Sequence, residues 1–138
     1  MSFELQTLEE AVASFEAEAD DEFVDPRRLS VVIDKLQAKL CRVVAAAARR
    51  HEHQLTGESP AGWVAKQCQI SKNAAADRLC VGEQLDRLPL VAEALSSGGI
   101  GYQAASVLCH LQERLVEAGA SIDEEEWVGR ARDLGRGA

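Results

Sequence analysis

Few side chains in this sequence combine the types and the spacing that catalysis requires. His110 and Glu113 stand one helical turn apart, where a carboxylate could orient a general base, although two ordinary surface residues on one helix face have the same spacing. No nucleophile with a nearby base, no glycine-rich phosphate loop and no ligand cluster stands out. We therefore expect no enzymatic activity, no cofactor and no small-molecule substrate.

The cysteines indicate packing and not metal binding. They are widely spaced, none belongs to a Cys-x-x-Cys pair, and each lies in a predicted helix among mostly apolar neighbours. We therefore expect reduced, largely buried thiols and no metal site, at Cys41, Cys68, Cys80 and Cys109. The sequence also has no signal-peptide pattern and no apolar run near the roughly 18 residues that span a membrane. These features predict a cytoplasmic protein without a membrane partner.

A stripe of basic residues offers a different chemistry, the neutralisation of phosphate charge. The helix predicted from residue 26 to about residue 53 carries four bases that recur every seven residues, so each drifts only about 20° from the last. Two more bases fall in the same arc, which is roughly 100° wide and contains no acid. The six, hereafter the basic stripe, are Arg28, Lys35, Lys39, Arg42, Arg49 and Arg50. The alternative is an ordinary solvated face of a surface helix.

The apolar positions of this long helix predict which of its sides packs against the core. Aliphatic residues recur there at about 100° per residue and gather on one face. The predicted inner residues are Leu29, Val32, Ile33, Leu36, Leu40, Val43, Val44 and Ala47.

The net charge of −8 argues against a nucleic-acid partner only until its distribution is considered. Residues 1–25 hold nine of the 23 acids and no Lys or Arg, so the remainder of the chain has 14 acids and 15 bases. The acidic segment predicts an amphipathic helix whose apolar positions are Phe3, Leu8, Val12 and Phe15. Folded back, it would partly mask the basic stripe, with Glu9, Glu16 and Asp20 facing Arg28, Lys35 and Lys39. The alternative is an acidic arm that never docks.

Residues 59–110 contain two predicted helix–turn–helix units. In the first, Ser59 and Pro60 begin a short helix that ends near Cys68, and Ser71 caps a second helix. In the second, a helix begins at Leu88-Pro89, breaks at Gly98-Gly99 and restarts at residue 101 or 102. We expect Trp63 to fill much of the local core at the first corner. The helix that Ser71 opens is either a DNA recognition helix with exposed bases, or one of several short helices that merely pack; the exposed bases would be Lys66, Lys72 and Arg78.

The order of these motifs resembles one family, the domain of unknown function 222, a helical domain found upstream of HNH endonuclease domains. The resemblance covers about residues 29–134. It is carried by Trp63, the alanine-rich helix after Ser71, the run Leu85-Asp86-Arg87-Leu88-Pro89, Ala94-Leu95, Gly99-Ile100 and Ala104-Ala105. It implies an all-helical fold and a link to DNA transactions, and it supplies no catalytic residues. Residues 1–138 contain no His-Asn-His constellation, so we expect this chain not to cleave DNA.

Together these observations predict an all-α bundle of about six or seven helices, two of them long, with a central helix–turn–helix-like corner. Only 4% of the residues are aromatic, so alanine and aliphatic side chains must fill the interior, which suits closely packed helices. We expect an acidic segment over residues 1–25, a helical domain over residues 26–134 and a frayed tail over residues 135–138. The predicted function is a non-catalytic DNA-associated module that contacts phosphates, and the alternative is a homodimerisation or other protein–protein module.

Overall fold

The computed structural model describes residues 2–50 and 56–137, and for residues 135–137 it describes the backbone alone. The prediction of an all-α fold is confirmed: the described residues form seven α-helices and one short 3-10 helix, with no strand. The helices are α1 (Phe3–Glu16), η1 (Asp21–Phe23), α2 (Pro26–Arg49), α3 (Pro60–Cys68), α4 (Lys72–Leu85), α5 (Pro89–Ser97), α6 (Tyr102–Glu117) and α7 (Glu124–Gly137).

The predicted helix starts are confirmed by their caps. The Asp25 carboxylate accepts a hydrogen bond from the Arg27 backbone N–H at 2.9 Å, and Pro26 occupies the first turn of α2. The hydroxyls of Ser59 and Ser71 accept from backbone N–H groups three residues on, each at 3.1 Å. These side chains satisfy donors that the first turn of a helix leaves unpaired, so the local sequence fixes where α2, α3 and α4 begin.

The two tight corners end their helices through left-handed residues. Gly98 has a φ of 81° after α5, and the Gly99 N–H donates to the Ala94 carbonyl at 2.8 Å, as the Gly-Gly break predicts. The corner between α3 and α4 uses Gln69, at a φ of 56°, where the sequence offers no glycine. Both corners are therefore tight, but only the corner after α5 has the glycine that predicts a left-handed residue.

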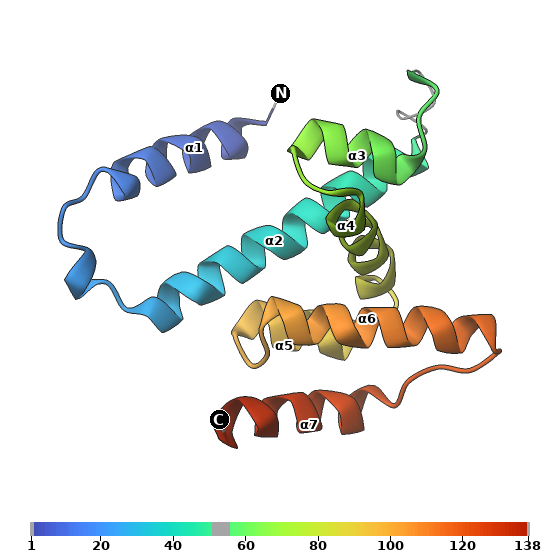
Figure 1. The fold of residues 1–138 in the computed structure, drawn as a ribbon. Coiled ribbons are helices and arrows are strands. Elements are labelled where there is room, and N and C mark those ends of the chain that lie inside the picture. Colours follow the sequence, from blue (N-terminus) through green and yellow to red (C-terminus); the bar gives the residue numbers. More distant parts are fainter. Residues whose placement is uncertain (1, 51–55, 138) are drawn as a thin grey trace.

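Helix α4 is the centre of the bundle. It packs against α2, α3, α5 and α6, while α5, α6 and α7 lie close together below it (Figure 1). The main core joins α2, α4, α5, α6 and α7, and its fully buried members include Cys41, Val81, Leu85, Leu88 and Leu95. Because most sides of α4 are covered, the structure favours the packing interpretation of this helix over that of a recognition helix.

A smaller core lies under the first corner. Val64 of α3 is fully buried there with Val44 of α2 and Ala75 of α4. Trp63 packs against this cluster but is only half-buried. Trp63 therefore takes part in this core as predicted, but it is only partly buried, and the fully buried residue is the next one, Val64.

The prediction for the inner face of α2 is largely wrong. Its buried residues are Ala38, Cys41, Val44, Ala45 and Ala47, so only two of the eight predicted positions are buried. The bulky aliphatic residues remain exposed, at 37–53% of their surface, and these are Val32, Ile33, Leu36, Leu40 and Val43. Small side chains face α4 because they allow the two helices to approach closely, and the larger ones lie on a neighbouring arc that the bundle leaves uncovered.

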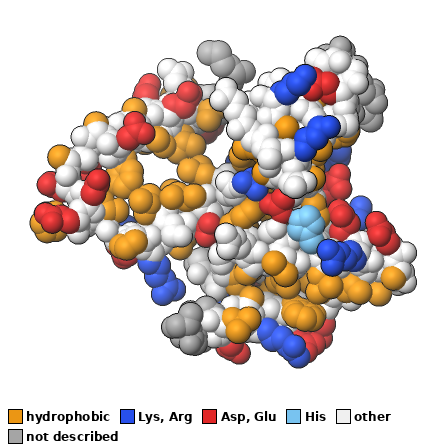
Figure 2. Space-filling view, viewed as in Figure 1, with side chains coloured by type: hydrophobic (Ala, Val, Ile, Leu, Met, Phe, Trp, Pro, Cys, Tyr) orange, Lys and Arg blue, Asp and Glu red, His pale blue; other side chains and the backbone are white. Residues whose placement is uncertain are grey.

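Helix α1 stands apart from the bundle. The predicted amphipathic helix is present, but none of its residues is buried, and Phe3 and Phe15 expose 79% and 44% of their surface. Figure 1 shows α1 running back along the outer side of α2, and Figure 2 shows hydrophobic side chains gathered on the facing sides of the two helices. Among the described residues no ion pair joins α1 to α2, so the expected pairing of Glu9, Glu16 and Asp20 with the basic stripe is not formed.

Candidate nucleic-acid interface and an interhelical polar cluster

The structure leaves the whole basic stripe at the surface of α2. All six side chains are exposed, because the stripe lies on the side of the helix away from the small residues that face α4. Within the described ranges, five of them form no ion pair: Arg28, Lys35, Lys39, Arg42 and Arg49. Unpaired guanidinium and ammonium groups in water are available to an anionic partner.

Lys66, in the last turn of α3, and Lys72, the first residue of α4, form a separate and weaker basic site. Lys66 Nζ lies 3.2 Å from a carboxylate oxygen of Glu58, and both lysines are exposed. A hydrogen bond from Thr56 lowers the pKa of Glu58, and Lys66 and Lys72 add to that effect. The negative charge of Glu58 therefore offsets part of the positive charge that these lysines would present to a phosphate.

Arg78 is not on the outer side of α4, and the prediction that it is exposed is wrong. Its side chain is only 22% exposed and its guanidinium lies 2.9 Å from the Asp77 carboxylate. The guanidinium also lies 5.3 Å from the centre of the Tyr102 ring. It faces the Gln37 side chain, whose amide oxygen accepts hydrogen bonds from it once the amide is turned to satisfy both residues. Arg78 thus links α2, α4 and α6 and is unsuited to contacting a phosphate backbone.

Asp77 is the centre of a polar cluster that no pattern in the sequence predicts. Its carboxylate accepts hydrogen bonds from the Tyr102 hydroxyl at 2.8 Å and from the Ser106 hydroxyl, and it lies 2.8 Å from His110 Nε2. Burial raises the pKa of Asp77, but the hydrogen bonds from Ser106, His110 and Tyr102 outweigh it and leave the pKa below its ordinary value. The carboxylate is therefore held ionised between α4 and α6.

One turn further along both helices, a second group of polar side chains meets. Cys80 of α4 lies beside Glu113 of α6, and burial followed by the hydrogen bond to Glu113 raises the pKa of the Cys80 thiol well above its ordinary value. One potential ligand atom from each of Cys80, His110 and Glu113 falls within 4.8 Å of the others. His110 and Glu113 are therefore not an isolated surface pair. Their spacing was visible in the sequence, but the facing pair of Asp77 and Cys80 was not.

The thiols otherwise agree with the prediction. All four are free, Cys41, Cys80 and Cys109 are buried, and Cys68 is half-buried at the end of α3. The Cys41 sulfur lies 3.4 Å from the Tyr102 hydroxyl.

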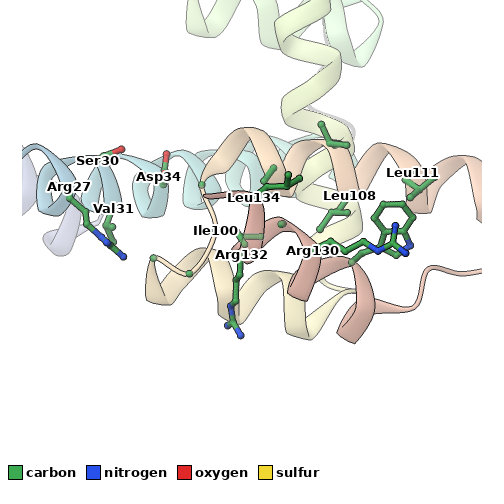
Figure 3. Close-up of a pocket in the computed structure, with 17 residues that line it drawn as sticks. Arg27, Ser30, Val31, Asp34, Ile100, Leu108, Leu111, Arg130, Arg132 and Leu134 are labelled. Atoms are coloured by element: carbon green, nitrogen blue, oxygen red, sulfur yellow. The ribbon is translucent and has the colours of Figure 1, made fainter. Parts of the chain in front are cut away.

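A groove of about 1180 Å³ lies between the N-terminal half of α2, the corner at Gly98 to Gly101, α6 and α7. Figure 3 shows Ile100, Leu108 and Leu111 lining it together with Arg130 from α7 and Asp34 from α2. Arg130 already pairs with Glu126 at 2.7 Å and stacks on Trp127, so its charge is partly satisfied. The lining of the groove is mainly apolar, and its polar side chains are Arg27, Ser30, Asp34, Arg130 and Arg132.

These features define an all-helical bundle with one exposed basic helix face. A family model described as "Domain of unknown function (DUF222)" matches residues 16–127, and the chain belongs to that family. The match contains α2 to α6 and leaves out all of α1 but its last residue, Glu16. Comparisons with curated proteins and with solved structures found no match. Within the described residues, no helix has both the length and the apolar character that crossing a membrane requires.

Proposed function

We propose that this chain is a non-catalytic, DNA-associated helical module that contacts phosphates through the basic stripe of α2. The proposal is supported chiefly by the exposure of the stripe, in which five bases have no acidic partner among the described residues. From Arg28 to Arg49 a helix rises about 30 Å, close to one turn of duplex DNA. The resemblance to the N-terminal region of HNH-endonuclease-type proteins also supports a DNA-associated role.

The chemistry of the stripe fits backbone contact and not sequence recognition. Lysine and arginine side chains bind phosphates through charge, which gives affinity and position but carries no base information. A recognition helix would need exposed side chains on α4, whose sides are mostly covered. We therefore expect binding that is independent of sequence and weakens steeply with salt.

Fluorescence anisotropy with a labelled duplex of mixed sequence tests this proposal. The triple variant Lys35→Ala, Lys39→Ala, Arg42→Ala should bind at least ten-fold more weakly at low salt, and its slope of log affinity against log salt should fall by about 0.9 for each lost contact. The matched control Arg87→Ala, Arg114→Ala, Arg132→Ala removes the same charge from exposed sites elsewhere. An equal loss in both variants, or no binding by the native chain, would contradict the proposal.

A second candidate function, homodimerisation, is favoured by a separate observation. Fourteen large apolar side chains are exposed in the part of the chain that the structure describes, and ten of them lie between Phe3 and Val43, on α1, η1 and α2. Three of them are phenylalanines with about 200 Å² each, and together these leave on the order of 400 Å² uncovered. Exposed apolar area of this size, gathered on neighbouring elements, is available to an apolar partner surface.

A further inference from the structure

We infer that Cys80, His110 and Glu113 form a binding site for a divalent transition-metal ion, and that Zn²⁺ is the ion their chemistry fits best. The three residues come from two packed helices, α4 and α6, and one potential ligand atom from each lies within 4.8 Å of the other two. Sulfur, imidazole nitrogen and carboxylate oxygen are the three ligand types that zinc takes in proteins. Magnesium and calcium prefer oxygen alone, so the thiol argues against them.

The distances are close to those that a bound ion needs. Zinc bonds of about 2.0–2.3 Å in a tetrahedron separate the ligand atoms by roughly 3.4–3.8 Å. The ligand atoms lie within 4.8 Å of one another, so a shift of about an ångström in the His110 and Glu113 side chains would bring them to the separation that a zinc ion needs. Both residues are half-buried at the edge of the interface, whereas Cys80 is held in the core, so Glu113 has the most room to move.

Asp77 supplies the second observation in favour of a metal site. In zinc-binding histidines the ring nitrogen that does not bind the metal usually donates a hydrogen bond, often to a carboxylate. This hydrogen bond fixes the orientation of the ring and makes the histidine a better ligand. His110 Nε2 lies 2.8 Å from Asp77 Oδ1, so Nδ1 remains for the metal. Asp77 is itself held by Tyr102 and Ser106. The cluster thus contains a prospective ligand together with its supporting carboxylate.

The exposure of the cluster predicts an open coordination position. The His110 side chain is 39% exposed, so solvent reaches the site from that side. With three protein ligands, a water molecule would complete a four-coordinate ion. The site goes beyond the proposed phosphate contacts, because none of its residues belongs to the basic stripe.

Metal titration of the full chain, stripped of metal by a chelator and kept reduced, tests the inference. Zn²⁺ should bind with one equivalent against a chromophoric competitor, and Co²⁺ should give tetrahedral absorption with a thiolate charge-transfer band. Glu113→Gln should weaken Zn²⁺ binding at least ten-fold, and Cys80→Ala should abolish the charge-transfer band. The control Cys68→Ala removes a half-buried thiol on α3 and should change neither readout.

Asp77→Asn separates a positioning role from a purely structural one. Loss of a carboxylate behind a ligating histidine typically costs 10–100-fold in metal affinity, so this variant should keep the charge-transfer band but bind Zn²⁺ that much more weakly. Glu113 lies at the half-buried edge, so Glu113→Gln should keep the helical circular dichroism of the native chain. The inference is overturned if the native chain binds no stoichiometric Zn²⁺, if Glu113→Gln binds it as tightly, or if only Cys68→Ala removes the Co²⁺ band.

Discussion

Gly82 of α4 lies against the backbone of Cys41 of α2, so closely that a Cβ atom on Gly82 would overlap the Cys41 carbonyl group. The same Cβ would lie 2.8 Å from the Cβ of Ala45. A glycine, a cysteine and an alanine thus allow the two central helices to touch along their backbones. This contact explains why small residues, and not the larger aliphatic residues of α2, face the core.

Gly82→Ala should therefore destabilise the chain by about 3 kcal/mol or more, because backbone atoms cannot give way as a flexible side chain can. Gly129→Ala is the matched control: this glycine also lies within a helix, and a Cβ there would meet no atom within 4 Å. Alanine in an open helical position should stabilise by about 0.5–1 kcal/mol. Urea denaturation of the two variants should shift the midpoint in opposite directions, and equal shifts would refute the close contact.

The helix boundaries were predictable because their causes are local. Asp25, Ser59 and Ser71 cap the residues that immediately follow them, and Gly98 turns the chain within a single residue. The covered face of α2 was not predictable in the same way. Its aliphatic arc is apolar enough to be a core, but whether another helix covers it depends on packing among elements that are far apart in the sequence.

Asp77→Asn should make the stability of the chain less dependent on acid pH. The pKa of Asp77 is lower in the folded chain than its ordinary value of about 3.9, so ionised Asp77 stabilises the fold above that pH. This contribution is lost as the pH falls through the lowered folded pKa. Near pH 7 we expect a cost of about 2 kcal/mol, because the hydroxyls of Tyr102 and Ser106 would lose an ionised acceptor.

Thermal denaturation between pH 2.5 and 7 checks this prediction. The difference in stability between the native chain and Asp77→Asn should be largest near neutral pH and should shrink below pH 4. Asp86→Asn is a control in the same stretch, since Asp86 is exposed at the end of α4. A constant difference at every pH would show that the amide perturbs packing and that the charge of Asp77 is irrelevant.

The polar cluster shows why functional residues are harder to predict than helices. The partners of Asp77 stand 25, 29 and 33 residues further along the chain, and only the crossing of α4 and α6 unites them. The spacing of Asp77 with Cys80, and of His110 with Glu113, marks one side of each helix. That these two sides face each other is a property of the fold. The basic stripe was predictable because a single helix contains it.

Removal of residues 1–25 should tighten DNA binding several-fold at low salt. The segment carries nine acids and no Lys or Arg, and α1 runs alongside α2. No ion pair joins the two helices in the described residues, so the acids would act as a diffuse negative field that salt screens. The truncated chain should also show a steeper salt dependence, because more phosphates would be neutralised.

The triple stripe variant provides the control for that deletion. Lys35→Ala, Lys39→Ala, Arg42→Ala introduced into the truncated chain should erase the gain in affinity. An unchanged affinity after truncation would mean that the acidic segment does not influence the stripe. If neither the full chain nor the truncated chain binds DNA, homodimerisation becomes the leading function.

Homodimerisation predicts that the uncovered faces of α1 and α2 meet those of a second copy. The face of α2 presents Ile33, Leu36 and Leu40 beside the basic stripe, and the face of α1 presents Val12 and Phe15 beside acidic residues. An acidic helix of one copy placed on the basic helix of the other would match both apolar contact and charge. A stable interface buries about 800 Å² on each partner, and the exposed apolar side chains of α1, η1 and α2 supply much of that area.

Light scattering coupled to size-exclusion chromatography tests this arrangement. The native chain should elute with twice the chain mass of 14.9 kDa, and Leu36→Glu, Leu40→Glu should elute as a monomer, because four charges would be buried at the interface. Val107→Glu is the matched control, since Val107 is 66% exposed on α6, outside the proposed interface. Deletion of residues 1–25 should also yield a monomer. A native chain that is monomeric at high concentration, or a dimer that survives both changes, would reject this interface and leave the apolar arc of α2 for another partner.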